Sequence, residues 1–185
     1  LQQLTVRENG YQAKIPSFDA YYRAAKQTNQ KLLIEFKRTP AMTDDFVQRF
    51  ATRYGAQLQR HGDLIHSLDY QLIQQSRQLM PKVSASYILS FNLVGLPRTQ
   101  ANYFTMEYTT LNSTFIDEAH AQHKKVFAWT VNDSSDMDQL LLKNVDGIIT
   151  DELADLQQEI QANFRPNTYA MRLVNYLLEM PASQF

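Results

Sequence analysis

Short runs of β-branched and aromatic residues alternate along the chain with stretches whose apolar residues recur at helical spacing. Six of the short runs are bounded by polar or turn-forming residues and are predicted to be strands. They lie at residues 32–37, 63–68, 82–89, 102–108, 125–131 and 146–150. The runs recur roughly every 20 to 30 residues, which fits βα units and a parallel sheet, either doubly wound or closed into a barrel.

Amphipathic segments between the runs are predicted to be helices that cover the sheet. The segment from about Thr43 begins with a capping residue and two acidic residues, which suit the positive end of a helix. It then places Phe46, Val47, Phe50 and Tyr54 on one face. Similar helices are predicted after Ser17, after Asp69 with a stop at Pro81, after Asn112, and after Ser134 or Ser135.

Two regions depart from this alternation of predicted strands and helices. Residues 90–101 contain Gly95 and Pro97 and are predicted to be a longer loop. Residues 164–185 follow the last strand and helix as a tail, in which Tyr169 and Leu173 belong to an apolar helical pattern. We expect this tail to be a helix docked on a body formed by residues 1–163. A partner-binding or membrane-surface helix is the alternative, but Arg172 is the only basic residue of that pattern.

Composition narrows the class of protein. The chain has 185 residues, of which 44% are hydrophobic and 20% charged, as expected for one soluble globular domain. Its net charge of -1 comes without a long basic cluster, so nucleic acid is not an expected partner. The absence of cysteine excludes disulfides and thiol chemistry but leaves the compartment open. No apolar run approaches the roughly 20 residues that cross a bilayer.

Known catalytic motifs are also missing from the sequence. It has no GxSxG elbow, no HExxH helix and no phosphate-binding glycine loop, which argues against serine hydrolase, zinc peptidase and nucleotide-dependent chemistry. The chain begins at Leu1 and shows no signal peptide. We therefore expect a truncated or processed piece of a longer protein.

Glu35 and Lys37 are the most informative charged pair. They alternate with Ile34 and Phe36 in the run LLIEFK, so both charged groups lie on one face of a strand. They could form a mutually satisfied ion pair at a strand end. Alternatively, they could belong to an active site at the carboxyl end of a parallel strand, where a carboxylate could hold a hard cation and an ammonium group a phosphate.

Three further residues are candidates for a site. Trp129, the only tryptophan, lies near the end of a predicted strand and is either a core residue or a pocket wall. Glu107 in NYFTMEY is either a paired surface residue or a functional carboxylate. His66 is the only histidine predicted to face a pocket, whereas His120 and His123 suit the end of a helix. The strands that carry these candidate residues come close to one another only if the sheet closes into a barrel.

Read in order, the segments IPSFDAYY, KLLIEFK, IHSLD, VFAWTVND and VDGIITDE resemble the successive blocks of the glycerophosphodiester phosphodiesterase family. The resemblance runs from about Ile15 to about Leu156. It implies a TIM-type (β/α) barrel of the phospholipase-C-like phosphodiesterase kind, with about six βα units in this chain. It also implies hydrolysis of glycerophosphodiesters to sn-glycerol 3-phosphate and an alcohol, with Ca²⁺ or Mg²⁺ as the cation.

The same resemblance suggests roles for individual residues. Glu35 corresponds to a metal ligand, Lys37 to a catalytic lysine near the phosphate, and Trp129 to a wall of the substrate pocket, with Glu107 and His66 as further substrate-binding candidates. The family's HRG block, its strand with Glu and Asp ligands, and its HD block do not occur in this sequence. We therefore expect this chain alone to bind metal weakly or not at all, and to be inactive.

Several alternatives remain open. The chain could be an inactive fragment or pseudoenzyme that serves as a binding or regulatory module. It could also belong to another phosphodiesterase of the same barrel type. A (β/α) barrel typically needs about 250 residues, so we expect either a preceding segment or a homodimer to cover the open edge at LLIEFK. This piece is expected to be soluble, and the longer protein to carry a membrane domain or to be cytoplasmic or secreted.

Overall fold

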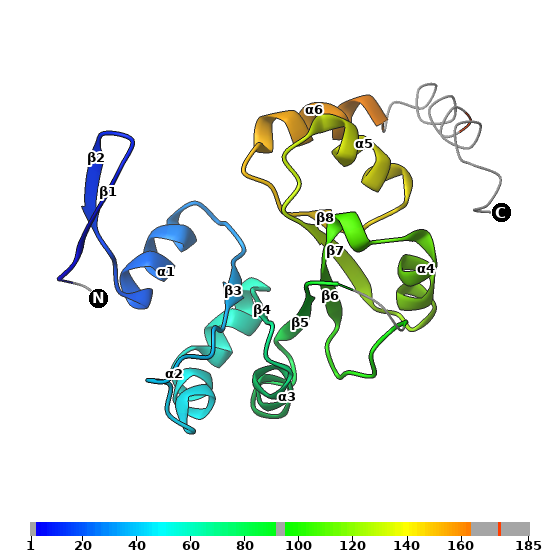
Figure 1. Cartoon of the computed structure of the whole chain (residues 1–185). Coiled ribbons are helices and arrows are strands. Elements are labelled where there is room, and N and C mark those ends of the chain that lie inside the picture. The colour runs from blue at the N-terminus through cyan, green and yellow to red at the C-terminus, as the bar shows by residue number, and fades with distance from the viewer. Residues whose placement is uncertain (1–2, 92–94, 164–173, 175–185) are drawn as a thin grey trace.

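A curled sheet of six parallel strands forms the centre of the computed structural model, which describes residues 3–91, 95–163 and 174. The strands are neighbours in chain order (Figure 1). They are β3 (Leu33–Glu35), β4 (Leu64–Ser67), β5 (Ser84–Leu89), β6 (Tyr103–Glu107), β7 (Lys125–Trp129) and β8 (Gly147–Ile148). All six predicted strands are confirmed, and the curled parallel sheet confirms the barrel-type α/β class.

Helices precede the six-stranded sheet, occupy most of the connections between its strands and follow its last strand. They are α1 (Phe18–Gln27), α2 (Phe46–His61), α3 (Tyr70–Leu79), α4 (Ser113–Ala121), α5 (Ser134–Leu142) and α6 (Leu153–Asn163), with a short 3₁₀ turn η1 (Tyr108–Thr110). The side chains of Ser17, Asp69 and Asn112 accept hydrogen bonds from backbone N–H groups in the first turns of α1, α3 and α4. These three predicted helix starts are confirmed, because each capping oxygen satisfies a donor that the helix leaves free.

Two helix starts differ from the prediction. Helix α2 begins at Phe46 rather than at about Thr43, because the Thr43 hydroxyl donates to the Asp45 carboxylate at 2.6 Å and caps no backbone N–H group. Helix α5 is capped by Asp133, whose carboxylate accepts from the N–H groups of Ser135 and Asp136. The serines after Asp133 belong to the helix and do not cap it.

The core lies between the sheet and the helices on one side of it (Figure 1). Ile65 of β4 and Phe36, just after β3, pack against α2, while Phe104 of β6 packs against Phe115 of α4. Because side chains alternate along a strand, the residues between these apolar anchors face the concave side of the sheet. Glu35 and His66 are two of these residues.

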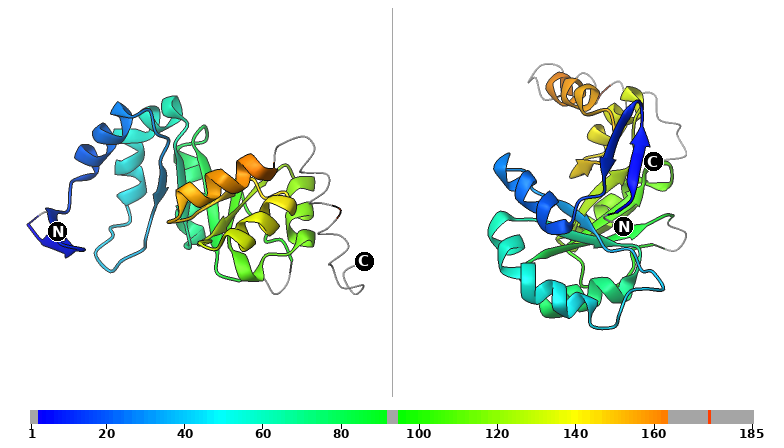
Figure 2. Two further views of the ribbon diagram at one scale, coloured as in Figure 1. Left: turned by 90° about the horizontal axis from the view of Figure 1, so that it is seen from above. Right: turned by 90° about the vertical axis from the view of Figure 1, so that its left-hand side faces the viewer.

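A β-hairpin precedes the sheet and was not predicted from the sequence. Strands β1 (Thr5–Glu8) and β2 (Tyr11–Lys14) pair antiparallel, and every residue of both is exposed. The turn between them is Asn9-Gly10, with φ of 47° and 81°. Two positive φ angles in an Asn-Gly pair are typical of a two-residue hairpin turn. The hairpin extends away from the sheet (Figure 2).

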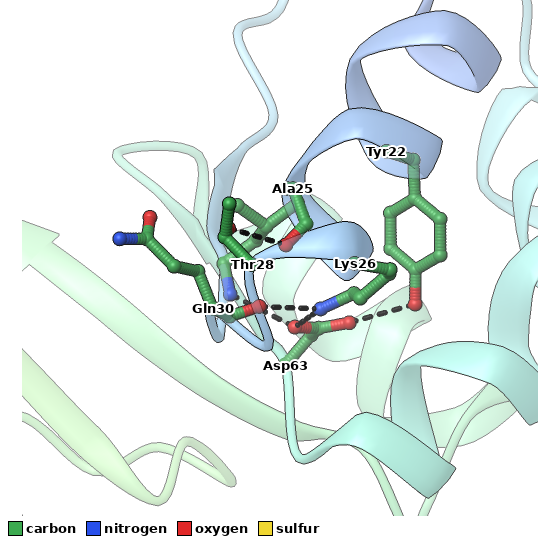
Figure 3. A network of polar contacts seen from close by, with 7 residues as sticks. Tyr22, Ala25, Lys26, Thr28, Gln30 and Asp63 are labelled. Atoms are coloured by element: carbon green, nitrogen blue, oxygen red, sulfur yellow. Dashed lines mark hydrogen bonds and ion pairs between the residues drawn. The ribbon is translucent and has the colours of Figure 1, made fainter.

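A buried carboxylate fixes α1 and β3 to the amino end of the sheet (Figure 3). Asp63 accepts hydrogen bonds from Tyr22 Oη at 2.8 Å, from Lys26 Nζ at 2.6 Å and from the Leu32 N–H group at 2.8 Å. Burial, together with the hydrogen bond to Asp63, raises the pKa of the Tyr22 hydroxyl above its ordinary value, so this group stays a donor. The network holds the start of β3, the strand that carries Glu35.

Two expectations concern the tail and the outer edge of β3. The predicted helical tail over 164–185 lies outside the described residues apart from Val174. On its outer edge β3 has no strand partner among the described residues, and coverage of that edge by another segment or a second copy stays a prediction. Within the described ranges, no helix is long and apolar enough to span a membrane.

Candidate active site

The end of β3 presents a carboxylate and an ammonium group side by side. Lys37 Nζ lies 3.3 Å from Glu35 Oε2, and the Glu35 side chain is 30% exposed while that of Lys37 is 73% exposed. Phe36, between them, is buried against Phe46 and Phe50 of α2. The aromatic anchor thus turns both charged groups away from the core at the carboxyl end of the strand. The two residues form the ion pair that was one of the two alternatives, and the pair stands at the edge where barrel proteins bind their ligands.

His66 lies beside this pair. It is the register partner of Glu35 on the neighbouring strand β4, and its side chain is half-buried. Its Nδ1 atom is buried and has no hydrogen-bond partner among the described residues. Burial lowers the pKa of His66 below its ordinary value, with Glu35 opposing that shift and Lys37 adding to it. The imidazole is therefore neutral at pH 7 and sits next to the charged pair.

Glu107 and Trp129 form a second group at the same edge of the sheet. They are register partners at the ends of β6 and β7, and both are half-buried. The Trp129 indole N–H donates to the Thr105 carbonyl oxygen at 3.1 Å, which fixes the ring against β6. The Glu107 carboxylate accepts from the Thr109 hydroxyl at 2.5 Å. Trp129 is thus positioned by one polar contact without being wholly enclosed.

The open sheet keeps the two groups apart. Strand β5 lies between β4, which carries His66, and β6, which carries Glu107. Among the described residues, no hydrogen bond or ion pair joins Glu35, Lys37 or His66 to Glu107 or Trp129. The structure therefore brings together the first three predicted residues and, separately, the last two.

A third polar group at this edge was not singled out from the sequence. Asn132, after β7, accepts at Oδ1 from the Asp151 N–H group at 3.0 Å and from the Thr150 hydroxyl at 3.1 Å. Its amide nitrogen donates to the Asp151 carboxylate at 3.1 Å. These bonds tie the loop after β7 to the loop after β8. The sequence signal that could have indicated this group is the pair of polar residues at the end of each of the two strand blocks, ND in WTVND and DE in DGIITDE.

The described residues do not form a complete cation site by themselves. In the ranges 3–91 and 95–163, and at residue 174, no group of three or more His, Asp or Glu side chains lies close enough together to hold a metal ion. Glu35 can offer carboxylate oxygens, whereas Ca²⁺ takes about six to eight oxygen ligands and Mg²⁺ needs an octahedral set. Further ligands would have to come from outside these residues.

The fold and the charged edge define an α/β-barrel type of protein with its polar groups at the carboxyl ends of the strands. The model of the glycerophosphoryl diester phosphodiesterase family matches residues 5–155. The chain belongs to this family, as the order of its sequence blocks predicts.

Individual relatives agree with this assignment. YhdW of Bacillus subtilis strain 168, whose name gives it provisionally as a glycerophosphodiester phosphodiesterase, is 28% identical over 149 residues, or 75% of this chain. A glycerophosphodiester phosphodiesterase from Parabacteroides distasonis superposes with a TM-score of 0.68 at 22% identity, covering 81% of this chain and 66% of that one. A phosphodiesterase from Oleispira antarctica, solved with the product sn-glycerol 3-phosphate, superposes with a TM-score of 0.65 at 18% identity, covering 80% and 62%.

This chain matches only part of the length of its relatives. The chain spans 59% of the length of the curated relative it matches, YhdW. The structural likenesses lie below 25% identity and establish the fold.

Proposed function

We propose that the protein containing this chain hydrolyses glycerophosphodiesters to sn-glycerol 3-phosphate and an alcohol. The observation that carries the proposal is the Glu35–Lys37 pair at 3.3 Å, held at the carboxyl end of a strand in a chain of this family. A phosphodiester is an anion, and Lys37 is a mostly exposed cation at that edge. The product named with the Oleispira antarctica structure supports the same class of small-molecule substrate.

Each site residue has a distinct proposed role. Lys37 neutralises charge on the phosphate as it builds up in the transition state. Trp129 packs its exposed ring surface against the glycerol or alcohol part, because Thr105 fixes the indole on β6. Glu107 accepts a hydrogen bond from a substrate hydroxyl beside Trp129. His66, neutral and half-buried, offers a ring nitrogen to the substrate next to Glu35.

Metal dependence is part of the proposal. Glu35 would contribute one carboxylate to a Ca²⁺ or Mg²⁺ ion, with the remaining ligands supplied from outside the described residues. Such an ion, when bound, polarises a phosphoryl oxygen. Lys37, whose Nζ atom lies 3.3 Å from Glu35 Oε2, orients that carboxylate until the ion binds.

For proton transfer, this chain offers few candidate residues at the site. Of its four histidines, three lie at or just after the carboxyl ends of α2 and α4, which lead into the amino ends of β4 and β7. These three are His61, His120 and His123. Only His66 stands at the site, and its lowered pKa makes it a weak base. We infer that this chain alone does not catalyse the reaction. The missing HRG and HD blocks favour a binding module as the second candidate function.

The proposal is tested by the release of sn-glycerol 3-phosphate from glycerophosphocholine by the complete gene product. Lys37→Met is expected to lower kcat/KM about a hundredfold, because one preorganised contact to the transition-state charge is lost. Lys31→Met is the matched control, since Lys31 is exposed just before the start of the same strand. Equal activity of the two variants would overturn the role of Lys37, and no product from the unaltered protein would favour the binding module.

A further inference from the structure

A groove lined by nitrogen-bearing side chains lies between α1 and the end of α2. It encloses about 500 Å³, a volume in the range of small-molecule pockets. The lining includes four basic side chains and two amides, which are Arg23, Lys26, Arg60, His61, Gln27 and Gln57. Among the described residues, no Asp or Glu belongs to this lining. Because α2 leads into the amino end of β4, this basic groove lies at the opposite end of the sheet from the Glu35–Lys37 pair.

Two arginines of the basic groove have no partner. Among the described residues, neither Arg23 nor Arg60 forms an ion pair or a side-chain hydrogen bond. By contrast Arg53, which also belongs to α2, pairs with Asp19 of α1. Both unpaired arginines are exposed. Like charges that face the same groove repel each other, and a bound anion relieves this repulsion.

Helix dipoles explain only part of this cluster. Basic residues in the last turn of a helix interact favourably with the dipole. Lys26 lies in the last turn of α1, and Arg60 and His61 lie in the last turn of α2. Arg23 lies before the last turn of α1, and yet its side chain lines the same groove. The dipoles therefore leave Arg23 without a structural reason for its position.

The floor of the basic groove is fixed and electrically balanced. Lys26 Nζ donates to the buried Asp63 carboxylate at 2.6 Å and to the Gln30 carbonyl oxygen at 2.8 Å (Figure 3). Tyr22 Oη donates to the other carboxylate oxygen, and the Tyr22 ring packs edge to face on the His61 ring at 6.2 Å. The charge of Asp63 is thus compensated within this network. The two unpaired guanidinium groups remain as the excess positive charge of the groove.

We propose that the basic groove is a second ligand site, which binds inorganic phosphate or a small phosphate monoester. Such a ligand carries about two negative charges at pH 7, which matches the two unpaired guanidinium groups of Arg23 and Arg60. A guanidinium group offers paired N–H donors with the spacing of phosphate oxygens. The amides of Gln27 and Gln57 are available for hydroxyl groups of the ester. This site uses none of the residues of the proposed active site and does not depend on the proposed function.

The test is a calorimetric titration of the complete gene product with inorganic phosphate, at constant ionic strength and without divalent cations. Arg23→Gln and Arg60→Gln are each expected to lower the affinity about tenfold, because a charge-assisted contact to the anion is lost. Neither substitution removes a polar contact within the described residues, so both variants are expected to fold. Arg53→Gln removes the same charge from α2 outside the groove and is the matched control, with unchanged affinity expected.

Three outcomes would overturn the proposal. Equal weakening by Arg53→Gln would mean that the overall charge, and not the groove, governs binding. If Lys37→Met abolishes phosphate binding while Arg23→Gln and Arg60→Gln retain it, phosphate occupies only the proposed active site. In that case this inference fails and the proposed function gains support. Binding to vesicles that contain phosphatidic acid, without binding of inorganic phosphate, would assign the groove to a membrane surface instead.

Discussion

Glu35 and His66 are register partners on two adjacent parallel strands, and the buried Nδ1 atom of His66 has no hydrogen-bond partner among the described residues. A carboxylate next to an imidazole usually keeps the imidazole protonated. Here burial outweighs that attraction, and Lys37 adds to the effect, so the pKa of His66 falls below its ordinary value. A neutral histidine beside a charged pair has a measurable consequence for stability.

The first prediction is an acid-side loss of stability that depends on His66. Because the folded pKa is lower than the unfolded one, the unfolded chain binds a proton before the folded chain does as the pH falls. The stabilising effect is complete above the unfolded value of about 6.5 and is lost as the pH falls through the folded value. Urea unfolding above and below that value should show a smaller loss for His66→Gln than for the unaltered chain. Identical losses would contradict the neutral state of His66.

The second prediction concerns the carboxylate at the opposite end of the sheet. Asp63→Ala should lower the free energy of unfolding by about 3 kcal/mol, because it leaves the largely buried ammonium group of Lys26 and the Leu32 N–H group without their partner. Asp45→Ala removes an exposed ion pair with Arg49 and an exposed hydrogen bond from Thr43, and should cost much less. Chemical denaturation of both variants measures the difference. Similar values would mean that the Asp63 network does not hold α1 and β3.

The third prediction contrasts two glycines. At Gly147 an added Cβ would lie 2.8 Å from the ring of Phe127 on the neighbouring strand, so Gly147→Ala should cost about 1 to 3 kcal/mol. At Gly55, within α2, the nearest atom is the flexible Met80 side chain at 3.2 Å. There Ala should be neutral or stabilise by up to about 1 kcal/mol, since alanine favours a helix. Thermal unfolding distinguishes the two signs, and Phe127→Leu should relieve the cost at Gly147.

The strands were predictable because their signal is local. Each of the six apolar runs contains a strand, and the caps at Ser17, Asp69 and Asn112 set the starts of three helices. The start at Thr43 was wrong because the hydroxyl bonds to Asp45, a choice that the residue types alone do not determine. The hairpin was missed although Asn9-Gly10 is a strong turn signal.

The site was only partly predictable for a different reason. Alternation along one strand sufficed to place Glu35 and Lys37 on the same face. The position of His66 opposite Glu35 depends on strand register, and the burial of Asp63 depends on contacts with Tyr22, which is 41 positions away in sequence. Periodicity within a short window carries no information on either relationship.

The fourth prediction tests the central claim that the end of β3 is part of a phosphodiesterase active site. The complete gene product should release sn-glycerol 3-phosphate from glycerophosphocholine in the presence of Ca²⁺ or Mg²⁺. Glu35→Gln should lower kcat/KM at least about a hundredfold, because it removes the proposed anionic metal ligand. Glu118→Gln, at an exposed position on α4, is the matched control and should retain full activity. Full activity of Glu35→Gln would contradict the claim.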